Sequence, residues 1–323
     1  VSFGASELDE LEASLAALAR FEVAATAHVE GLIARGADTR QTYARLVATL
    51  DAGERGRARL VTALRKALAG DGTALMAPHA SELLATIYDQ LATLVRTRAM
   101  YQDLYRDDSA YGLDGTGESL AEGWVWAAIS QRHWLIDTFP TYSGRGTALL
   151  ALANAYDDQG RGADARAMLQ LFLCGNRQAE ILASKEAGED DAIYGGIYAR
   201  AIGLTDYEGC AAASDDRDTV ARAWMQLAEM HQATTGEADL AVAAMSRASS
   251  DARAAVYADA LRALADLQLA RDAVFDAIPP LDELVLFADQ SSANAEAAGG
   301  LRDWAVQALG RILALLWRPS SLP

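Results

Sequence analysis

The sequence predicts an all-α fold, in which an antiparallel helical bundle is followed by a region of helical hairpins. Three observations favour helix throughout. The apolar residues are rich in alanine and leucine, which lose little side-chain entropy in a helix. Apolar residues recur with helical spacing, and no stretch alternates apolar and polar residues for long enough to predict a strand. With 323 residues, 51% of them hydrophobic, the chain can bury a large core and form one or two domains.

Three long amphipathic segments make up the first predicted domain, over residues 1–107. The first segment carries leucines at helical spacing and stops near Gly36, a residue type that commonly ends helices. The second has the same periodicity, with an interruption expected at Gly53 and Gly56. The third begins at Pro78 and is long enough for about seven turns. Three long helices in succession are typical of an antiparallel bundle.

Shorter helices are predicted in a second domain, over residues 118–323. The glycine-rich stretch 107–117 is predicted to be a loop that marks the boundary between the domains. A long helix is expected over residues 238–278, with Pro279-Pro280 separating it from a closing helix over residues 301–317. The apolar face of that C-terminal helix is expected to seal the core or to join two copies of the chain in a homo-oligomer.

Two stretches of the second domain have the same pattern, Ala148 to Leu173 and Ala221 to Ala248. Both resemble the tetratricopeptide repeat (TPR), which places large, small and aromatic residues on one helix, glycine at the turn, and an alanine and a large residue on the next helix. The matching residues are Leu149, Leu152, Ala153, Tyr156, Gly160, Ala165 and Leu169 in the first stretch, and Trp224, Leu227, Ala228, His231, Gly236, Ala241 and Met245 in the second. The resemblance implies TPR-like stacked hairpins that offer a concave surface to a protein or peptide partner.

Aromatic and basic residues gather between residues 124 and 145. Aromatic side chains make up only 7% of the chain, so a local excess of them indicates a binding surface for a ligand or a partner. The alternative is an ordinary core helix with one or two rings at the surface. The candidate binding residues are Trp124, Arg132, His133, Trp134, Tyr142 and Arg145.

His79 and Glu82 are the candidate metal ligands. Their spacing of three residues, just after Pro78, places both side chains on one face of a helix. The alternative is a solvated helix start, at which the helix dipole favours the Glu82 carboxylate. No further residue completes a metal-binding motif in the sequence, and no cofactor is predicted.

The formal net charge of −17 argues against binding to nucleic acid or to anionic lipids, because like charges repel. No apolar stretch approaches the ~20 residues of a membrane-spanning helix, so a soluble protein is predicted. The acidic N-terminal region is unlike a signal peptide or a transit peptide. The compartment stays open, with the cytoplasm slightly favoured and a processed mature form as the alternative because the chain begins at Val1. Cys174 and Cys210 lack CxxC spacing and are expected to be buried free thiols, with one disulfide as the alternative.

Motifs of common enzyme classes are missing from the sequence. There is no glycine-rich phosphate loop, GxSxG elbow, HExxH helix or cysteine-rich metal motif, which favours a non-catalytic protein over an enzyme. The leading hypothesis is therefore a helical interaction or scaffold protein that binds a protein or peptide partner. The second hypothesis is a small-ligand or metal-binding helical module, of a sensory or transport accessory kind.

Overall fold

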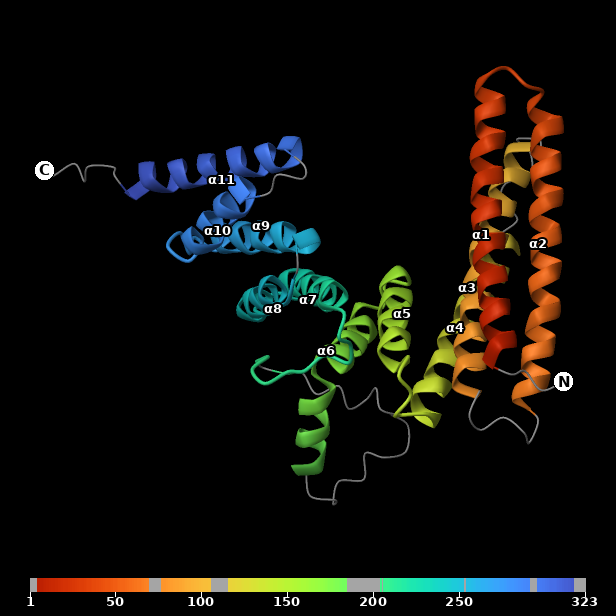
Figure 1. The fold of residues 1–323 in the computed structure, drawn as a ribbon, viewed down its shortest axis with the longest axis horizontal. Coiled ribbons are helices and arrows are strands. Elements are labelled where there is room, and N and C mark those ends of the chain that lie inside the picture. Colours follow the sequence, from red (N-terminus) through yellow and green to blue (C-terminus); the bar gives the residue numbers. More distant parts are fainter. Residues whose placement is uncertain are drawn as a thin grey trace, which may run out of the picture. The chain divides into compact units, whose positions relative to one another are not determined.

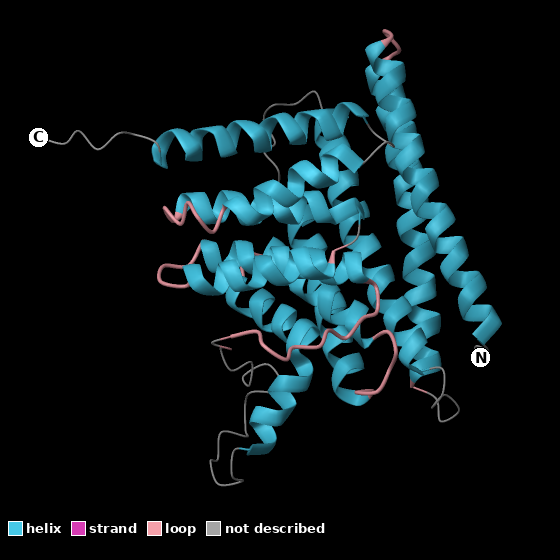
Figure 2. Cartoon of the chain, turned by 60° about the vertical axis from the view of Figure 1, so that its left-hand side comes forward, coloured by secondary structure: helices cyan, strands magenta, loops and turns pink. Residues whose placement is uncertain are grey.

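A computed structural model describes residues 5–69, 77–105, 116–184, 204, 206–252, 254–290 and 295–316 of the chain. These residues form eleven α-helices, and none of them lies in a strand (Figure 1, Figure 2). The all-α class expected from the sequence is therefore confirmed. The chain divides into two compact units, Val1–Ala155 and Tyr156–Pro323. None of the described helices is long and apolar enough to cross a membrane.

Unit 1 is built from long helices, as its sequence predicts. Gly36, with a φ of 86°, ends the first helix, and the Asp38 side chain caps the second by accepting a hydrogen bond from the Gln41 backbone N–H at 2.8 Å. The helices are α1 (Ala5–Ala34), α2 (Thr39–Leu68), α3 (Ala77–Tyr105), α4 (Thr116–Thr138) and α5 (Arg145–Asp158), which crosses into the second unit.

In the described part of unit 1, two hydrophobic clusters lie along the seams of α1, α2 and α3. One cluster contains Leu8 and Leu15 of α1, together with apolar residues of α2, α3 and α4. The other contains Val29 of α1, with Leu50 of α2 and Leu94 of α3. The α1 residues of the two clusters follow the seven-residue spacing of a coiled-coil-like seam. The position between the clusters on α1 is not apolar, and it is the starting point of the candidate site.

Two sequence expectations for this unit differ from the structure. Helix α2 runs without interruption through Gly53 and Gly56, because both lie within a helix that buries an apolar face on α3. The division between the units falls after Ala155, whereas the sequence placed the boundary at residues 107–117. Helix α4 belongs to unit 1 because it packs on α3, where the Trp124 ring stacks on Tyr88 at a centroid distance of 5.7 Å. Most of the stretch 107–117 lies outside the described residues.

Unit 2 consists of shorter helices. The long helix expected over residues 238–278 is instead two helices followed by a turn in which Asp272 has a φ of 58°. Pro279-Pro280 lies in the first turn of the next helix, where prolines are tolerated because those N–H groups have no intrahelical partner. The helices are α6 (Gly162–Ser184), α7 (Arg217–Gln232), α8 (Ala238–Asp251), α9 (Ala254–Ala270), α10 (Ile278–Gln290) and α11 (Ala295–Leu316).

The two stretches that resemble the tetratricopeptide repeat each contain a helix, a turn and a helix. Gly160 and Gly236 both adopt left-handed conformations at the turns, with φ of 69° and 89°. All twelve of the other residues matched to the repeat pattern are buried. The assignment to that repeat, and the concave surface that it implies, stay predictions.

Cys174 and Cys210 form a disulfide, so the expectation of free thiols was wrong. The two cysteines are 36 residues apart, and their pairing depends on a loop that returns to α6, which local spacing cannot reveal. Helix α11 buries Ala305 and Ile312 in the last hydrophobic cluster, while Leu313 is exposed. A homo-oligomer through this helix stays a prediction, and Trp317 lies outside the described residues.

Candidate functional site

Two charged residues occupy core positions in the seam of unit 1. On α1, Glu22 follows Leu15 by seven residues and precedes Val29 by seven. On α2, Arg57 stands in the same relation to Leu50 and Leu64. The seven-residue periodicity of the apolar neighbours could have revealed both residues from the sequence. A charged residue at a core position either specifies the register between helices or belongs to a binding site.

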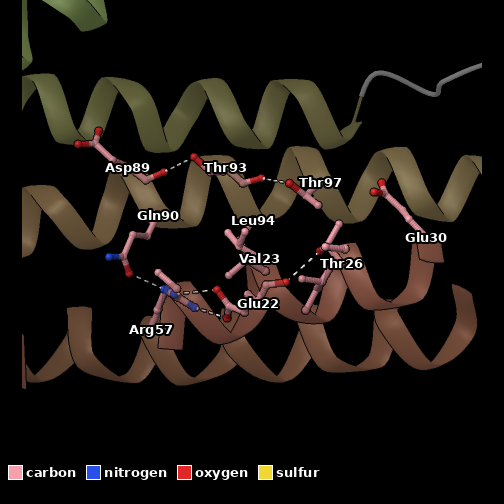
Figure 3. A pocket seen from close by; sticks show the side chains of 13 residues that line it. Glu22, Val23, Thr26, Glu30, Arg57, Asp89, Gln90, Thr93, Leu94 and Thr97 are labelled. Carbon is pink, nitrogen blue, oxygen red and sulfur yellow. Dashed lines mark hydrogen bonds and ion pairs between the residues drawn. The ribbon is translucent and has the colours of Figure 1, made fainter. Parts of the chain in front are cut away.

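Glu22 and Arg57 form a buried ion pair between the two hydrophobic clusters, with Gln90 of α3 as a third member (Figure 3). Arg57 Nη1 donates to Glu22 Oε1 at 2.7 Å, and Nη2 donates to Oε2 at 2.9 Å. Arg57 Nε donates to Gln90 Oε1 at 2.8 Å. Arg57 is fully buried and Glu22 is 9% exposed. This two-pronged, charge-assisted pair fixes the register of α1 and α2 and satisfies both buried charges. We call these three residues the polar layer.

Gly53 is required by the polar layer. A Cβ atom at this position would lie 2.2 Å from Glu22 Oε1 and 3.2 Å from Arg57 Nη1. Since real Cβ atoms essentially never approach another atom to 2.2 Å, any side chain at position 53 would push the carboxylate away from the guanidinium. The glycine expected to interrupt α2 thus admits the Glu22 side chain against the helix.

A groove with a volume of about 460 Å³ opens beside the polar layer, between α1, α2 and α3. This volume lies in the range of small-molecule sites, and the accessible surface of the groove is mainly apolar although several of its lining residues are polar. In Figure 3 the side chains of Asp89 and Glu30 lie at opposite ends of the groove, with Val23 and Leu94 between them. The lining residues are Ala19, Glu22, Val23, Thr26, Ala27, Glu30, Leu50, Arg57, Asp89, Gln90, Thr93, Leu94 and Thr97.

The two ends of the groove differ in charge. Asp89 pairs with Arg132 of α4 through both of its carboxylate oxygens, which offsets its negative charge. Glu30 accepts a hydrogen bond from the Tyr101 hydroxyl at 2.5 Å, and among the described residues no cation pairs with it. Burial, followed by the hydrogen bond to Glu30, raises the pKa of Tyr101, so the phenol stays neutral and donates its proton. The Glu30 end therefore carries a net negative charge.

The six residues predicted as a binding surface do not converge on one pocket. Trp124 packs on α3, and buried Arg132 contacts the groove wall through Asp89. Trp134 is 42% exposed and meets Phe139 edge to face at 5.4 Å, as a surface pair. The remaining three lie half-buried on α4, in the loop that follows it and at the start of α5: His133, Tyr142 and Arg145.

The predicted metal ligands lie at the other end of unit 1. His79 Nε2 is 3.9 Å from Asp9 Oδ1 and 3.7 Å from Glu12 Oε2, both on α1, and the three ligand atoms lie within 4.8 Å of one another. Glu82 instead accepts a hydrogen bond from the Tyr142 hydroxyl at 2.5 Å. The structure thus gives His79 two carboxylate neighbours that sequence spacing did not suggest, because they come from another helix.

Unit 2 contains a second cavity, with a volume of about 690 Å³, that is lined by both polar and apolar residues from the end of α5, from α6 and α7, and from the start of α8. His231 is buried there, and its Nδ1 lies 2.6 Å from Glu237 Oε2. Burial lowers the pKa of His231, whereas the hydrogen bond to His231 lowers that of Glu237. A neutral imidazole beside an ionised carboxylate donates from Nδ1 and keeps Nε2 as an acceptor.

The structure shows an all-α protein with a mainly apolar groove among its N-terminal helices, of a volume that a small molecule could fill. Comparison with known proteins adds no family to this description, since no protein-family model matches the chain and no curated protein is similar to it in sequence.

Proposed function

We propose that this protein binds a small ligand in the groove of unit 1, and that the ligand is an amphipathic cation. Such a ligand has an elongated apolar body and one ammonium-type end. The observation that carries the proposal is the combination of an apolar groove with a single carboxylate, Glu30, that no described cation neutralises.

The polar residues of the groove decide the charge of the ligand. Arg57 offsets Glu22, and Arg132 offsets Asp89, so neither of these two pairs attracts a further charge strongly. Glu30 remains as the partner of an ammonium group, to which it can offer its second carboxylate oxygen. A charge-assisted hydrogen bond of this kind contributes about 1.5–3 kcal/mol. The net charge of −17 also raises the local concentration of cations around the protein.

The apolar residues of the groove decide the body of the ligand. Val23 is 72% exposed and Ala27 is exposed on α1, while Leu50 and Leu94 form a buried floor. An alkyl chain or a ring laid along this surface would remove apolar area from water on both partners. These features support the hypothesis of a small-ligand helical module.

Three probes with the same alkyl chain test the proposal: octylamine, octanol and octanoate, each titrated into the protein by isothermal calorimetry below its aggregation concentration. Octylamine is expected to bind about tenfold more tightly than octanol, the factor that corresponds to about 1.4 kcal/mol, and octanoate more weakly still. Equal binding of all three probes, or the absence of octylamine binding, would contradict the proposal.

Two variants locate the binding site. Glu30→Gln is expected to reduce octylamine affinity to that of octanol, while Glu10→Gln, a change of the same type on an exposed α1 residue far from the groove, leaves it unchanged. Ala27→Phe would fill the groove from an exposed position and abolish binding of octylamine and octanol alike. Retained octylamine binding in Ala27→Phe would place the site elsewhere.

The hypothesis of a protein or peptide partner stays a second proposal, and its structural support lies in unit 2.

A further inference from the structure

A non-helical segment of unit 2 lies against α6, α7 and α8. We call its described residues, Leu204 and 206–213, the strap. Three strap side chains at intervals of three residues are buried, those of Leu204, Tyr207 and Cys210, while Asp206 and Glu208 between them are exposed. This pattern of spaced anchors with solvated residues between them is the one by which proteins bind non-helical peptides.

The backbone of the strap is recognised by groups that do not depend on its sequence. The amide of Asn176 on α6 donates to the Gly209 carbonyl at 2.9 Å and accepts from the Ala211 N–H at 3.0 Å. The Ala213 N–H donates to the Phe172 carbonyl at 2.8 Å. Arg247 on α8 donates to the carbonyl of Cys210 at 2.9 Å. These contacts would serve any chain of the same path.

Tyr207 is the main side-chain anchor of the strap. Its ring meets Trp224 edge to face at a centroid distance of 5.0 Å. Its hydroxyl is hydrogen-bonded to His231 Nε2, and His231 is oriented in turn by Glu237. Burial raises the pKa of Tyr207 to about 12, so the phenol is neutral and donates to the imidazole. The tyrosine site therefore selects by shape and by a hydrogen bond.

The strap does not fill the surface on which it lies. Leu204 forms part of the wall of the 690 Å³ cavity, which continues between α6 and α7 past Arg166 and Gln170. A longer segment could extend into this cavity, which both polar and apolar side chains line. The strap is held in place by its disulfide to α6, between Cys210 and Cys174.

We propose that the surface under the strap is a binding site for a tyrosine-containing peptide, that the strap occupies it as an internal ligand, and that the Cys174–Cys210 disulfide controls its release. A dithiol reductant attacks the disulfide as a thiolate, and the S–S bond breaks in two exchange steps. Cys174 and Cys210 each leave as a thiol, and the reductant becomes a disulfide, so two electrons and two protons move to the protein. This proposal concerns unit 2 and goes beyond ligand binding in unit 1.

The experiment must allow for the covalent attachment of the strap to the rest of the chain. A strap that is reduced but still part of the chain competes at an effective concentration in the millimolar range, so a free peptide cannot displace it readily. We would therefore combine Cys174→Ser and Cys210→Ser with Tyr207→Ala, which removes both the disulfide and the main anchor. The probe is a fluorescent peptide with the sequence of residues 202–214 and Cys210→Ser. The control peptide carries Tyr207→Ala in addition.

The variant chain is expected to bind the tyrosine peptide, and to bind the control peptide at least about tenfold more weakly, the loss expected of an anchor residue. The oxidised wild-type chain is expected to bind neither peptide. Asn176→Ala in the variant chain should also weaken binding of the tyrosine peptide, because it removes the side-chain amide that is hydrogen-bonded to the peptide backbone. A helical variant chain that binds both peptides equally, or neither, would overturn the proposal.

Hydrogen exchange of the unmodified chain provides a second measurement that needs no variant. Addition of a dithiol should speed exchange of the Ala211 and Ala213 amides, while the amides of α7 and α8 stay protected. In the oxidised chain these two strap amides are protected by hydrogen bonds to the Asn176 side chain and to the Phe172 carbonyl. If α7 and α8 lost protection together with the strap, the strap would be part of the core and the proposal would fail. Octylamine binding to unit 1 should survive in both measurements, so the two proposals fail separately.

Discussion

Replacement of Arg57 by methionine tests whether the polar layer holds unit 1 together. The substitution keeps most of the side-chain volume but leaves Glu22 buried without its guanidinium. Breaking a buried ion pair in this way costs about 3–5 kcal/mol. We expect the lower end, about 3 kcal/mol, because Glu22 lines the groove and water can reach it there. For a unit of this size, that corresponds to a loss of roughly 6–12 °C in melting temperature.

Thermal and urea unfolding, monitored by circular dichroism, measure this loss of stability. Arg55→Met is the matched control, since Arg55 lies on the same helix, is exposed, and pairs with half-buried Asp51 at an N–O distance of 3.6 Å. A surface pair of this kind contributes about 0.5 kcal/mol at most. If Arg57→Met destabilised the protein no more than Arg55→Met, the claim that the buried pair holds unit 1 together would be refuted.

Three further predictions concern other residues. Gly53→Ala should destabilise unit 1, because its Cβ would lie 2.2 Å from a buried carboxylate oxygen, whereas Gly56→Ala, whose Cβ meets no described atom within 4 Å, should stabilise it by about 0.5–1 kcal/mol in urea unfolding. Burial lowers the pKa of His231 below 6.5, so the unfolded chain binds more protons below that pH; stability in urea should fall as the pH drops below 6.5, and His231→Gln should flatten that dependence. Cobalt titration should give a visible spectrum that His79→Ala removes and Glu82→Gln leaves intact. If Glu82→Gln removed the spectrum and His79→Ala left it intact, the cluster of His79, Asp9 and Glu12 would not be the metal site.

Local patterns in the sequence predicted the helical class and several helix ends, but not the contacts between helices. The end of α1 at Gly36 and the turns at Gly160 and Gly236 could be predicted, because a left-handed glycine has a local cause. Pairs that depend on tertiary contact could not be predicted. The disulfide between Cys174 and Cys210 spans 36 residues and closes only when the strap returns to α6.

The candidate site was missed for a related reason. The concentration of rings near Trp134 suggested a binding surface, yet the structure divides those rings between the α3–α4 contact and the surface. The better signal was the charge of Glu22 and Arg57 at positions spaced by seven from leucines. Seven-residue periodicity shows that a charged residue occupies a position that is normally apolar and buried in the core. It cannot show that two such charges on different helices face each other, because that depends on the register between the helices.

The polar layer and the groove are best understood as one feature. A seam in which Glu22 and Arg57 meet at Gly53 cannot be filled by interdigitating apolar side chains, so a gap remains between α1 and α3 beside it. Glu22→Leu combined with Arg57→Met would replace the pair with apolar volume, a change that is often neutral or stabilising by about 1–4 kcal/mol. We expect this double variant to melt no lower than the wild type and yet to bind octylamine less tightly, because α1 can then close onto α3. A stable double variant with undiminished octylamine affinity would show that the groove is independent of the polar layer. Loss of affinity with retained stability would instead show that the buried charges are kept for binding, at a site where a more stable core was available.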